Sequence, residues 1–187
     1  MRRILWLGLV LATALVLPAC SSQKSAAEAA MAQTVQAYNA IKVQAGNIVP
    51  DEAKTIEDGI AAASAQLQGG DYKDALAAAT SLGTRVKELA DGLPEKTKQA
   101  QSAWAELSGS IPGTLATLDK RLKGLQVPAA GTPHADESPV VQLGHLKDSW
   151  TEAQAAAQAG RLAEAVIKGN DVRSGAVKLL NDLQAGS

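Results

Sequence analysis

Apolar residues recur at alternating steps of three and four along nearly the whole chain after residue 24. This spacing is the period of one face of an α-helix, whereas a strand would show apolar residues at every second position. The pattern predicts a first helix at about residues 24–48 and a helical hairpin at residues 50–93. The apolar stripes of these three helices are Met31, Val35, Tyr38, Ile41, Ala45 and Ile48; Ala53, Ile56, Ile60, Ala63 and Leu67; and Tyr72, Ala75, Ala79, Leu82, Val86, Leu89 and Leu93.

Residues typical of helix ends separate these segments. Pro50 occupies a first-turn position, which tolerates proline, and Asp51-Glu52 follows it, where acidic side chains stabilise a helix N-terminus. Gly69-Gly70 is expected to end the second helix, and Asp71 is expected to cap the third. The first half of the chain should therefore form three helices joined by short connections.

A second hairpin repeats the first at a distance of 90 residues. Gly70-Asp71-Tyr72-Lys73-Asp74-Ala75 aligns without a gap with Gly160-Arg161-Leu162-Ala163-Glu164-Ala165. The shared glycine turn and the shared apolar stripe are stronger indications than single identities, because each has a packing reason. The sequence therefore predicts two related hairpins, at residues 50–93 and 141–183. The second stripe is Leu162, Ala165, Gly169, Val172, Ala176, Leu179 and Leu183.

Between the hairpins, residues 94–125 carry the strongest apolar stripe of the chain. Its members are Trp104, Leu107, Ile111, Leu115, Leu118, Leu122 and Leu125. Pro112 falls inside this stripe, and an interior proline removes a hydrogen bond and kinks a helix. Because the stripe keeps its phase across Pro112, we expect one kinked helix or two nearly coaxial helices. Residues 126–139 contain three prolines and predict one long loop.

The fold is therefore expected to be all-α, an antiparallel helical bundle of five to six helices that contains the two hairpins. Residues 20–187 are enough for a single domain with a core. Hydrophobic residues make up 46% of the chain, but alanine alone is about a fifth of it and phenylalanine is absent. Alanine is the best helix former and buries little surface. We expect helices that pack closely through small side chains, with modest stability per residue.

The first 19 residues have the three parts of an export signal. Arg2 and Arg3 give a positive start, residues 4–17 form an apolar run, and Ala19 is a small residue before the expected cleavage site. The run is too short to span a bilayer, which takes about 20 apolar residues. Residues 1–19 are therefore expected to be a signal peptide. Without them, 16 basic residues face 19 acidic ones, a net charge near −3.

The single cysteine, Cys20, follows this leader in the run Leu17-Pro18-Ala19-Cys20. The run resembles the lipobox of bacterial lipoproteins, in which a Leu-type residue at −3 and a small residue at −1 precede the cysteine that becomes the mature N-terminus. Pro18 departs from the small or hydroxyl residue usual at −2. The resemblance implies acylation of Cys20, with chains such as palmitate, and anchoring in a membrane. Ser21, where inner-membrane lipoproteins have aspartate, implies the periplasmic side of a bacterial outer membrane.

Two other interpretations of Cys20 stay open. The cysteine would be incidental if the leader remains uncleaved as an anchor, or if an ordinary secretory signal is cut after Ala19. Leu17 argues against the second interpretation, because such cleavage sites have a small residue at that position. A disulfide within the chain is excluded, because there is no second cysteine.

The hairpin turn has a resemblance of its own. Gly70-Asp71-Tyr72 followed by Ala75-Leu76 is similar to the turn and second helix of tetratricopeptide repeats. Those repeats recur about every 34 residues, whereas this period is 90 and the second copy has Leu162 in place of the tyrosine. The resemblance implies a hairpin geometry and no superhelical peptide groove. The chain also resembles uncharacterised alanine-rich helical-hairpin lipoproteins of Gram-negative envelopes, a likeness that implies no activity.

Few residues offer binding chemistry. Trp104 and Trp150 are candidates for lining a ligand groove, but both lie on apolar stripes, where core packing is the favoured interpretation. Residue types that bind transition metals gather near the predicted loop. They are His134, Asp136, Glu137, His145 and Asp148. Their spacing matches no recognised motif and a solvated surface explains them as well, so neither a metal nor a cofactor is expected.

The charged residues indicate no specific ligand. Lys120, Arg121 and Lys123 lie beside Asp119 and are expected on a solvated helix face, with contact to lipid headgroups as the less favoured alternative. The chain has no basic stripe of the kind that binds nucleic acid. The charge pattern therefore does not indicate a nucleic acid as a partner.

Enzymatic chemistry is not indicated either. A nucleophile needs a base held beside it, and the only thiol lies in the lipobox-like run. Neither a Gly-rich phosphate loop nor a metalloprotease helix appears. We therefore expect a non-enzymatic, membrane-anchored interaction or scaffold module of the cell envelope, with an envelope protein as its partner. The alternative is a carrier that binds a small apolar ligand or a peptide between the hairpins, around Trp104 and Trp150.

Overall fold

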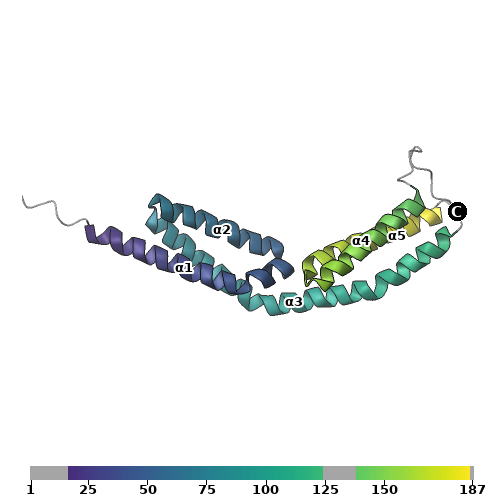
Figure 1. Ribbon diagram of the computed structural model, residues 1–187, viewed down its shortest axis with the longest axis horizontal. Coiled ribbons are helices and arrows are strands. Elements are labelled where there is room, and N and C mark those ends of the chain that lie inside the picture. The colour runs from purple at the N-terminus through teal and green to yellow at the C-terminus, as the bar shows by residue number, and fades with distance from the viewer. Residues whose placement is uncertain (1–16, 124–137, 186–187) are drawn as a thin grey trace, which may run out of the picture. The chain divides into compact units, whose positions relative to one another are not determined.

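The protein is helical throughout the part of the chain that the structure describes, residues 17–123 and 138–185 of a computed structural model (Figure 1). That part contains five helices and no strand. They are α1 (Leu17–Ile48), α2 (Pro50–Gly69), α3 (Tyr72–Leu122), α4 (Pro139–Gln158) and α5 (Leu162–Ala185). The predicted all-α helical bundle is confirmed.

The helices form two compact units. Within the described residues, the first comprises residues 17–43 and 51–91, and the second comprises residues 44–50, 92–123 and 138–185. Helix α3 contributes residues to both units, because its sequence passes the boundary at residue 91. The single-domain prediction did not anticipate this division. Each predicted hairpin instead packs around a buried cluster of its own.

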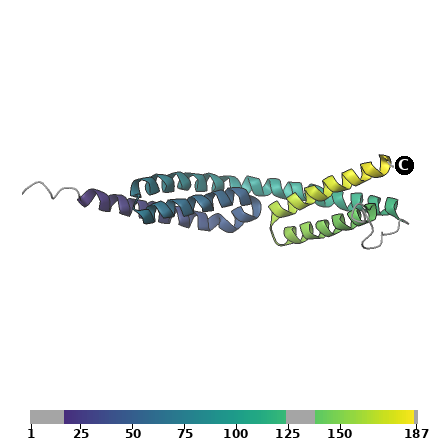
Figure 2. The same cartoon turned by 90° about the horizontal axis from the view of Figure 1, so that it is seen from above.

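In the first unit, α1, α2 and residues 72–91 of α3 lie alongside one another (Figure 2). The centre of its core is small, and is formed by Met31, Ala63, Ala79 and Leu82. Gly59 lets α2 approach α3 closely, because a Cβ at this position would lie 2.6 Å from Cδ2 of Leu82. Small side chains therefore set the spacing between these helices, as the alanine content predicted.

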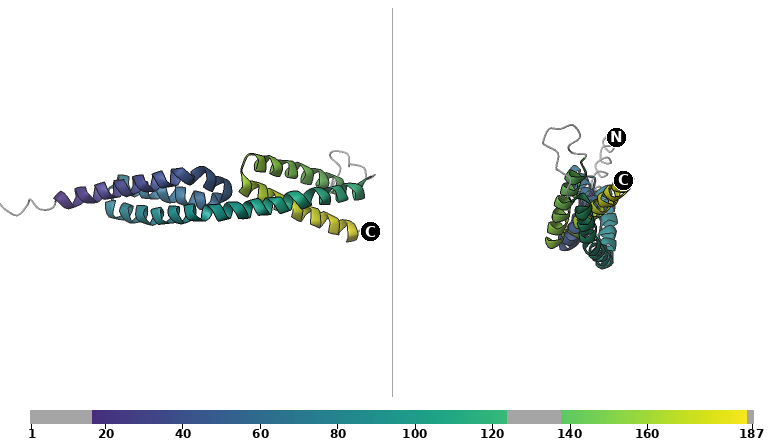
Figure 3. Two further views of the ribbon diagram at one scale, coloured as in Figure 1. Left: turned by 90° about the horizontal axis from the view of Figure 1, so that it is seen from below. Right: turned by 90° about the vertical axis from the view of Figure 1, so that its right-hand side faces the viewer.

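In the second unit, α4 and α5 form an antiparallel pair (Figure 3) that packs against residues 92–122 of α3. This core is larger and contains most of the big apolar side chains. Its buried members are Leu107, Ile111, Leu115, Leu118, Leu122, Leu143, Trp150, Ala153, Val172, Ala176 and Leu179. The stripe predicted for residues 94–125 is thus buried at every position from Leu107 to Leu122.

The two hairpin turns are the same structure at a distance of 90 residues. Gly70 has φ +88° and Gly160 has φ +77°, the left-handed region that glycine adopts readily. The N–H of Asp71 donates to the carbonyl oxygen of Gln66 at 2.9 Å, and the N–H of Arg161 donates to that of Ala156 at 2.9 Å. This is the Schellman arrangement, which satisfies carbonyl groups at a helix C-terminus. The predicted repeat is therefore present in backbone geometry.

The helix boundary that we predicted at residue 94 is wrong, because α3 spans it. Helix α3 continues through Pro94 and Pro112 as one helix of 51 residues, so Pro94 does not start a separate helix. Each proline deprives the carbonyl group four residues earlier of a helical hydrogen bond. Both prolines are exposed, so water can hydrate the backbone around them, and the apolar stripe keeps its phase past each one. Of the two alternatives for Pro112, the single helix is the one observed.

The turn geometry predicts opposite effects for two glycine substitutions in the second hairpin. Gly160→Ala should lower the free energy of unfolding by about 1–2 kcal/mol, because a Cβ is unfavourable at positive φ. Gly144→Ala should raise it by about 0.5–1 kcal/mol, because Gly144 lies inside α4 and a Cβ there meets no atom within 4 Å. Urea unfolding monitored by circular dichroism measures both effects. A stabilising Gly160→Ala would contradict the assigned turn.

Candidate functional site

Cys20, the predicted lipidation site, lies in the first turn of α1. The leader up to residue 16 is outside the described residues, and the description of side chains starts at Ser22. Residues 22–26 of α1 are exposed, and Ala27 is the first buried residue, with none of its surface accessible. Among the described helices, none is sufficiently long and apolar to cross a membrane. A helical segment therefore separates Cys20 from the packed part of the first unit.

Trp104 and Trp150, the candidates for lining a ligand groove, lie in contact. Their ring centroids are 5.2 Å apart and the ring planes are inclined by 24°, which is a stacked arrangement. Trp104 comes from α3 and Trp150 from α4, where Trp150 is 7% exposed. Such an aromatic pair stabilises a fold by about 0.5–1.5 kcal/mol beyond the burial of its area. Trp150 belongs to the buried core of the second unit and the partly buried Trp104 packs against it, which favours the packing interpretation.

Tyr38 forms a polar contact that the sequence reasoning missed. It lies on the apolar stripe of α1 and is 3% exposed. Its hydroxyl donates a hydrogen bond that is shared between the carbonyl oxygen of Ala53, at 3.2 Å, and Oε1 of Glu57, at 3.1 Å. The ammonium group of Lys42 lies 3.0 Å from the same Oε1. A buried phenol thus ties α1 to α2 and connects to an ion pair at the surface.

Two spacings in the sequence could have indicated the contact between Tyr38, Ala53 and Glu57. Tyr38 and Lys42 are four residues apart on α1, and Ala53 and Glu57 are four residues apart on α2. Residues at this spacing share one helix face. A short connection at Val49 makes the two helices antiparallel, so these faces can meet.

The electrostatics of the cluster oppose catalysis by Tyr38. Burial raises the pKa of Tyr38 to about 12, and the hydrogen bond to the Glu57 carboxylate adds to the increase. A general base or nucleophile must give up its proton near neutral pH. The pKa of Glu57 is lowered, first by the hydrogen bond from Lys42 and then by that from Tyr38. The arrangement keeps a neutral phenol and an ionised carboxylate, which suits a structural contact.

The residue types associated with metals do not converge in the described part of the chain. His134, Asp136 and Glu137 lie outside the described residues, whereas His145 and Asp148 are exposed on α4. Residues 17–123 and 138–185 contain no group of three histidine, cysteine or acidic residues that would hold a metal ion.

The basic residues near the end of α3 are exposed. Lys120, Arg121 and Lys123 all face solvent, as the solvated-face interpretation requires. Asp119 beside them pairs with Lys147 of α4 at 2.5 Å. The pKa of Asp119 is lowered, first by the hydrogen bond from Lys147 and then by the charge of Lys147, with the charge of Lys123 as the smallest cause. This acid therefore contributes a contact between α3 and α4, which the sequence reasoning did not foresee.

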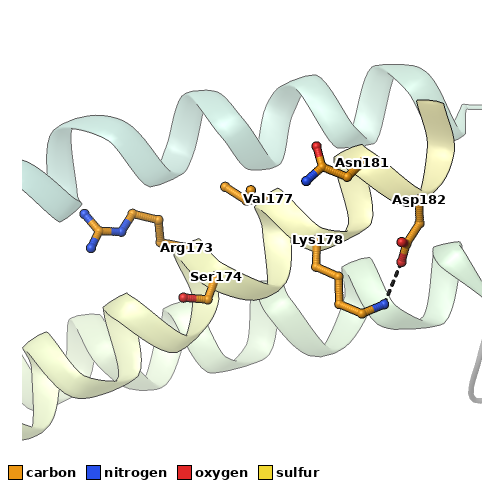
Figure 4. Close-up of a pocket in the computed structure, with 6 residues that line it drawn as sticks. All are labelled: Arg173, Ser174, Val177, Lys178, Asn181 and Asp182. Carbon is orange, nitrogen blue, oxygen red and sulfur yellow. Dashed lines mark hydrogen bonds and ion pairs between the residues drawn. The ribbon is translucent and has the colours of Figure 1, made fainter. Parts of the chain in front are cut away.

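A shallow pocket lies along α5 (Figure 4). Its lining residues are Arg173, Ser174, Val177, Lys178, Asn181 and Asp182, all from this one helix. Lys178 is paired with Asp182 at 2.6 Å, and Arg173 lies 3.3 Å from Glu106. The cationic groups are thus already neutralised by neighbouring acids. Neither Trp104 nor Trp150 lines this pocket.

Comparison of the chain with protein-family models, with curated proteins and with solved structures finds no match. The site is therefore interpreted from its residues alone.

The Tyr38 contact predicts a specific dependence of stability on alkaline pH. The folded pKa of about 12 exceeds the ordinary value of about 10. Unfolding therefore releases a proton between these values, and stability should fall by up to about 1.4 kcal/mol per pH unit in this window. Below pH 10 the contribution should be complete.

The measurement uses a Tyr72→Phe background, which leaves Tyr38 as the only tyrosine. Ultraviolet absorbance of the tyrosinate should give a midpoint near pH 12. Replacing Tyr38 by Phe in the same background should flatten the dependence of urea midpoints on pH between 10 and 12. A tyrosinate midpoint near pH 10 in the folded protein would show that Tyr38 is not buried as described.

Proposed function

We propose that this protein is a lipid-anchored, non-enzymatic interaction module of a bacterial cell envelope. The observation that carries the proposal is the position of Cys20, the only cysteine, directly after an export-type leader and Leu17-Pro18-Ala19. Lipid on this residue would hold the helical units at a membrane without a spanning segment. Each buried methylene of an acyl chain contributes about 0.8 kcal/mol, so two or three chains anchor a protein stably.

The mature part of the chain is suited to presenting surfaces. Its two units bury small and large apolar residues in separate cores, and their outer faces carry exposed ion pairs. Pairs such as Lys54 with Asp58 and Lys87 with Asp91 are exposed and four residues apart on one helix. Exposed pairs of this kind keep helices soluble and contribute little stability. We place the protein on the periplasmic side of the outer membrane, because Ser21 follows the cysteine.

The carrier alternative receives less support. It places an apolar ligand or a peptide around Trp104 and Trp150, yet these rings stack on each other, and Trp150 is part of the core of the second unit against which Trp104 packs. A ligand between them would have to separate the rings and displace the contacts that Trp150, 7% exposed, makes with its neighbours. The interaction module remains the better proposal.

Lipidation makes the first prediction for this function. Wild-type protein produced in a Gram-negative host should incorporate radiolabelled palmitate and sediment with membranes, because acyl chains partition into the bilayer. Cys20→Ala should incorporate none and should accumulate in its unprocessed form. Mass spectrometry of the mature N-terminus identifies the acylated residue.

Cys20→Ser is the matched control, since it conserves size and polarity but removes the sulfur that would be acylated. Equal membrane partitioning of wild type and both variants, without palmitate on the wild type, would reject the anchor.

The interaction role makes a second prediction. Crosslinking in intact cells should join the wild-type protein to an envelope protein and yield a discrete band. Cys20→Ala should lose that band although its helical content by circular dichroism is unchanged, because the unprocessed variant carries no lipid and keeps its leader, so it does not reach the outer membrane. The absence of any crosslinked envelope protein from the correctly anchored wild type would argue against an interaction module.

A further inference from the structure

The start of α1 is a short helical stalk. We define the stalk as residues 20–26; its described side chains, residues 22–26, are all exposed. Ala27 and Met31 are the first residues of α1 to be buried, at 0% and 5% exposure. Ala27 is seven positions after Cys20, which corresponds to about 10 Å along a helix axis. The residue that would carry lipid is therefore close to the packed body of the first unit.

The contacts of α1 identify which end of the first unit faces this stalk. Tyr38 bonds to Ala53 near the start of α2, whereas Met31 packs with Ala63 further along it. The two helices are therefore antiparallel, and the C-terminal end of α2 lies beside the beginning of α1. The turn at Gly70 follows that end of α2 directly. In Figures 1 and 2, α1 begins beyond this turn.

We propose that the bilayer surface lies against the end of the first unit that bears the α2–α3 turn, and that the stalk fixes this orientation. The inference rests on the lipidation of Cys20 proposed above. It adds that the anchor is not a long flexible tether: the turn-bearing end, around Gln68 and Lys73, faces the lipid headgroups. The opposite end of α2, at Asp51, points away from the membrane.

Geometry, and not charge, holds this orientation. The stalk and turn carry both signs: Lys24 pairs with Glu28 at 3.8 Å, and Lys73 is flanked in sequence by Asp71 and Asp74. Such a mixed surface gives no net attraction to anionic lipids of the kind that a basic cluster provides. The bilayer should therefore lie against this end in vesicles of neutral as well as anionic composition.

The length of α2 makes the proposed orientation distinguishable from one in which the opposite end of the unit faces the bilayer. Gln68 and Asp51 are both exposed on α2 and are 17 residues apart, a separation of about 25 Å along the helix. Even if the seven-residue stalk were fully extended, it would reach only about 25 Å. A probe at Gln68 should lie near the headgroups, and a probe at Asp51 should lie well beyond them.

The experiment uses the full-length protein, processed and lipidated in cells and reconstituted in phosphatidylcholine vesicles. Lipid on Cys20 blocks its thiol, so Gln68→Cys or Asp51→Cys provides the only free thiol for a small fluorophore. A fraction of the lipid carries a nitroxide quencher in its headgroup. We expect quenching to be several-fold stronger at position 68 than at position 51, and unchanged when anionic lipid is added.

Mass spectrometry of the same preparation records whether Cys20 is acylated. Equal quenching at the two positions, or stronger quenching at position 51, in an acylated and vesicle-bound protein would overturn the orientation and leave the proposed anchor intact. Protein that carries no lipid would overturn both proposals.

The stalk can be tested without changing the packed unit. A flexible Gly-Ser insertion of ten residues between Ser25 and Ala26 lies before the first buried residue, so it should leave lipidation and unfolding stability unchanged. It should also reduce the quenching at position 68 toward that at position 51, because the unit is then free to turn. Quenching at position 68 that is unaffected by the insertion would show that the stalk does not fix the orientation.

Discussion

Close packing through alanine and glycine is the constraint on which the rest of the structure depends. Ala27, Ala45, Ala75, Ala79, Ala153 and Ala165 are all fully buried. Gly59 and Gly169 admit leucine side chains to within 3 Å of where a Cβ would be. Helix axes can approach closely at such positions, but each alanine removes little apolar area from water. The helices therefore gain contact along their whole length, and long helices are what this composition needs for stability.

Contacts between alanines do not fix the register of two packed helices, because all alanine side chains have the same small size and shape. Larger and polar groups can supply that specificity. In the first unit, Tyr38 bonds to Ala53 across α1 and α2, and the buried Thr34 hydroxyl donates to the Ala79 carbonyl oxygen at 3.0 Å across α1 and α3. The Tyr38 hydroxyl also donates to the Glu57 carboxylate, and sliding α1 by one turn would break this side-chain contact. A buried polar group left without its partner costs about 1–3 kcal/mol. In the second unit, the stacked Trp104 and Trp150 have the corresponding role.

Local sequence signals predicted the helices and their turns, whereas most contacts between helices could not be predicted from the sequence. The glycine at position 70 and the 3–4 spacing of apolar residues are properties of one segment, so they indicated the turn and the buried stripes directly. The prediction that a separate helix begins at Pro94 was wrong because the effect of a proline depends on whether the backbone around it is exposed to water. That exposure follows from how the opposite face of the helix packs. The hydrogen bond of Tyr38 depends on how α1 meets α2, and the pairing of Asp119 with Lys147 depends on how α3 meets α4. The candidate site at Cys20 came wholly from sequence, because its signal is a local run and not a three-dimensional arrangement.

The 90-residue repeat also shows what distinguishes α1, the helix that contains Cys20. The two hairpins share the turns at Gly70 and Gly160, and their buried positions correspond from Ala75 and Ala165 to Leu89 and Leu179. What differs is the third helix that each hairpin packs against: α1 in the first unit and the second part of α3 in the other. Of these two partners, only α1 extends beyond its hairpin turn to a cysteine that follows an export-type leader. A helix bonded to α2 through Tyr38 and to α3 through Thr34 would transmit a membrane attachment to its whole unit, which a disordered tether would not.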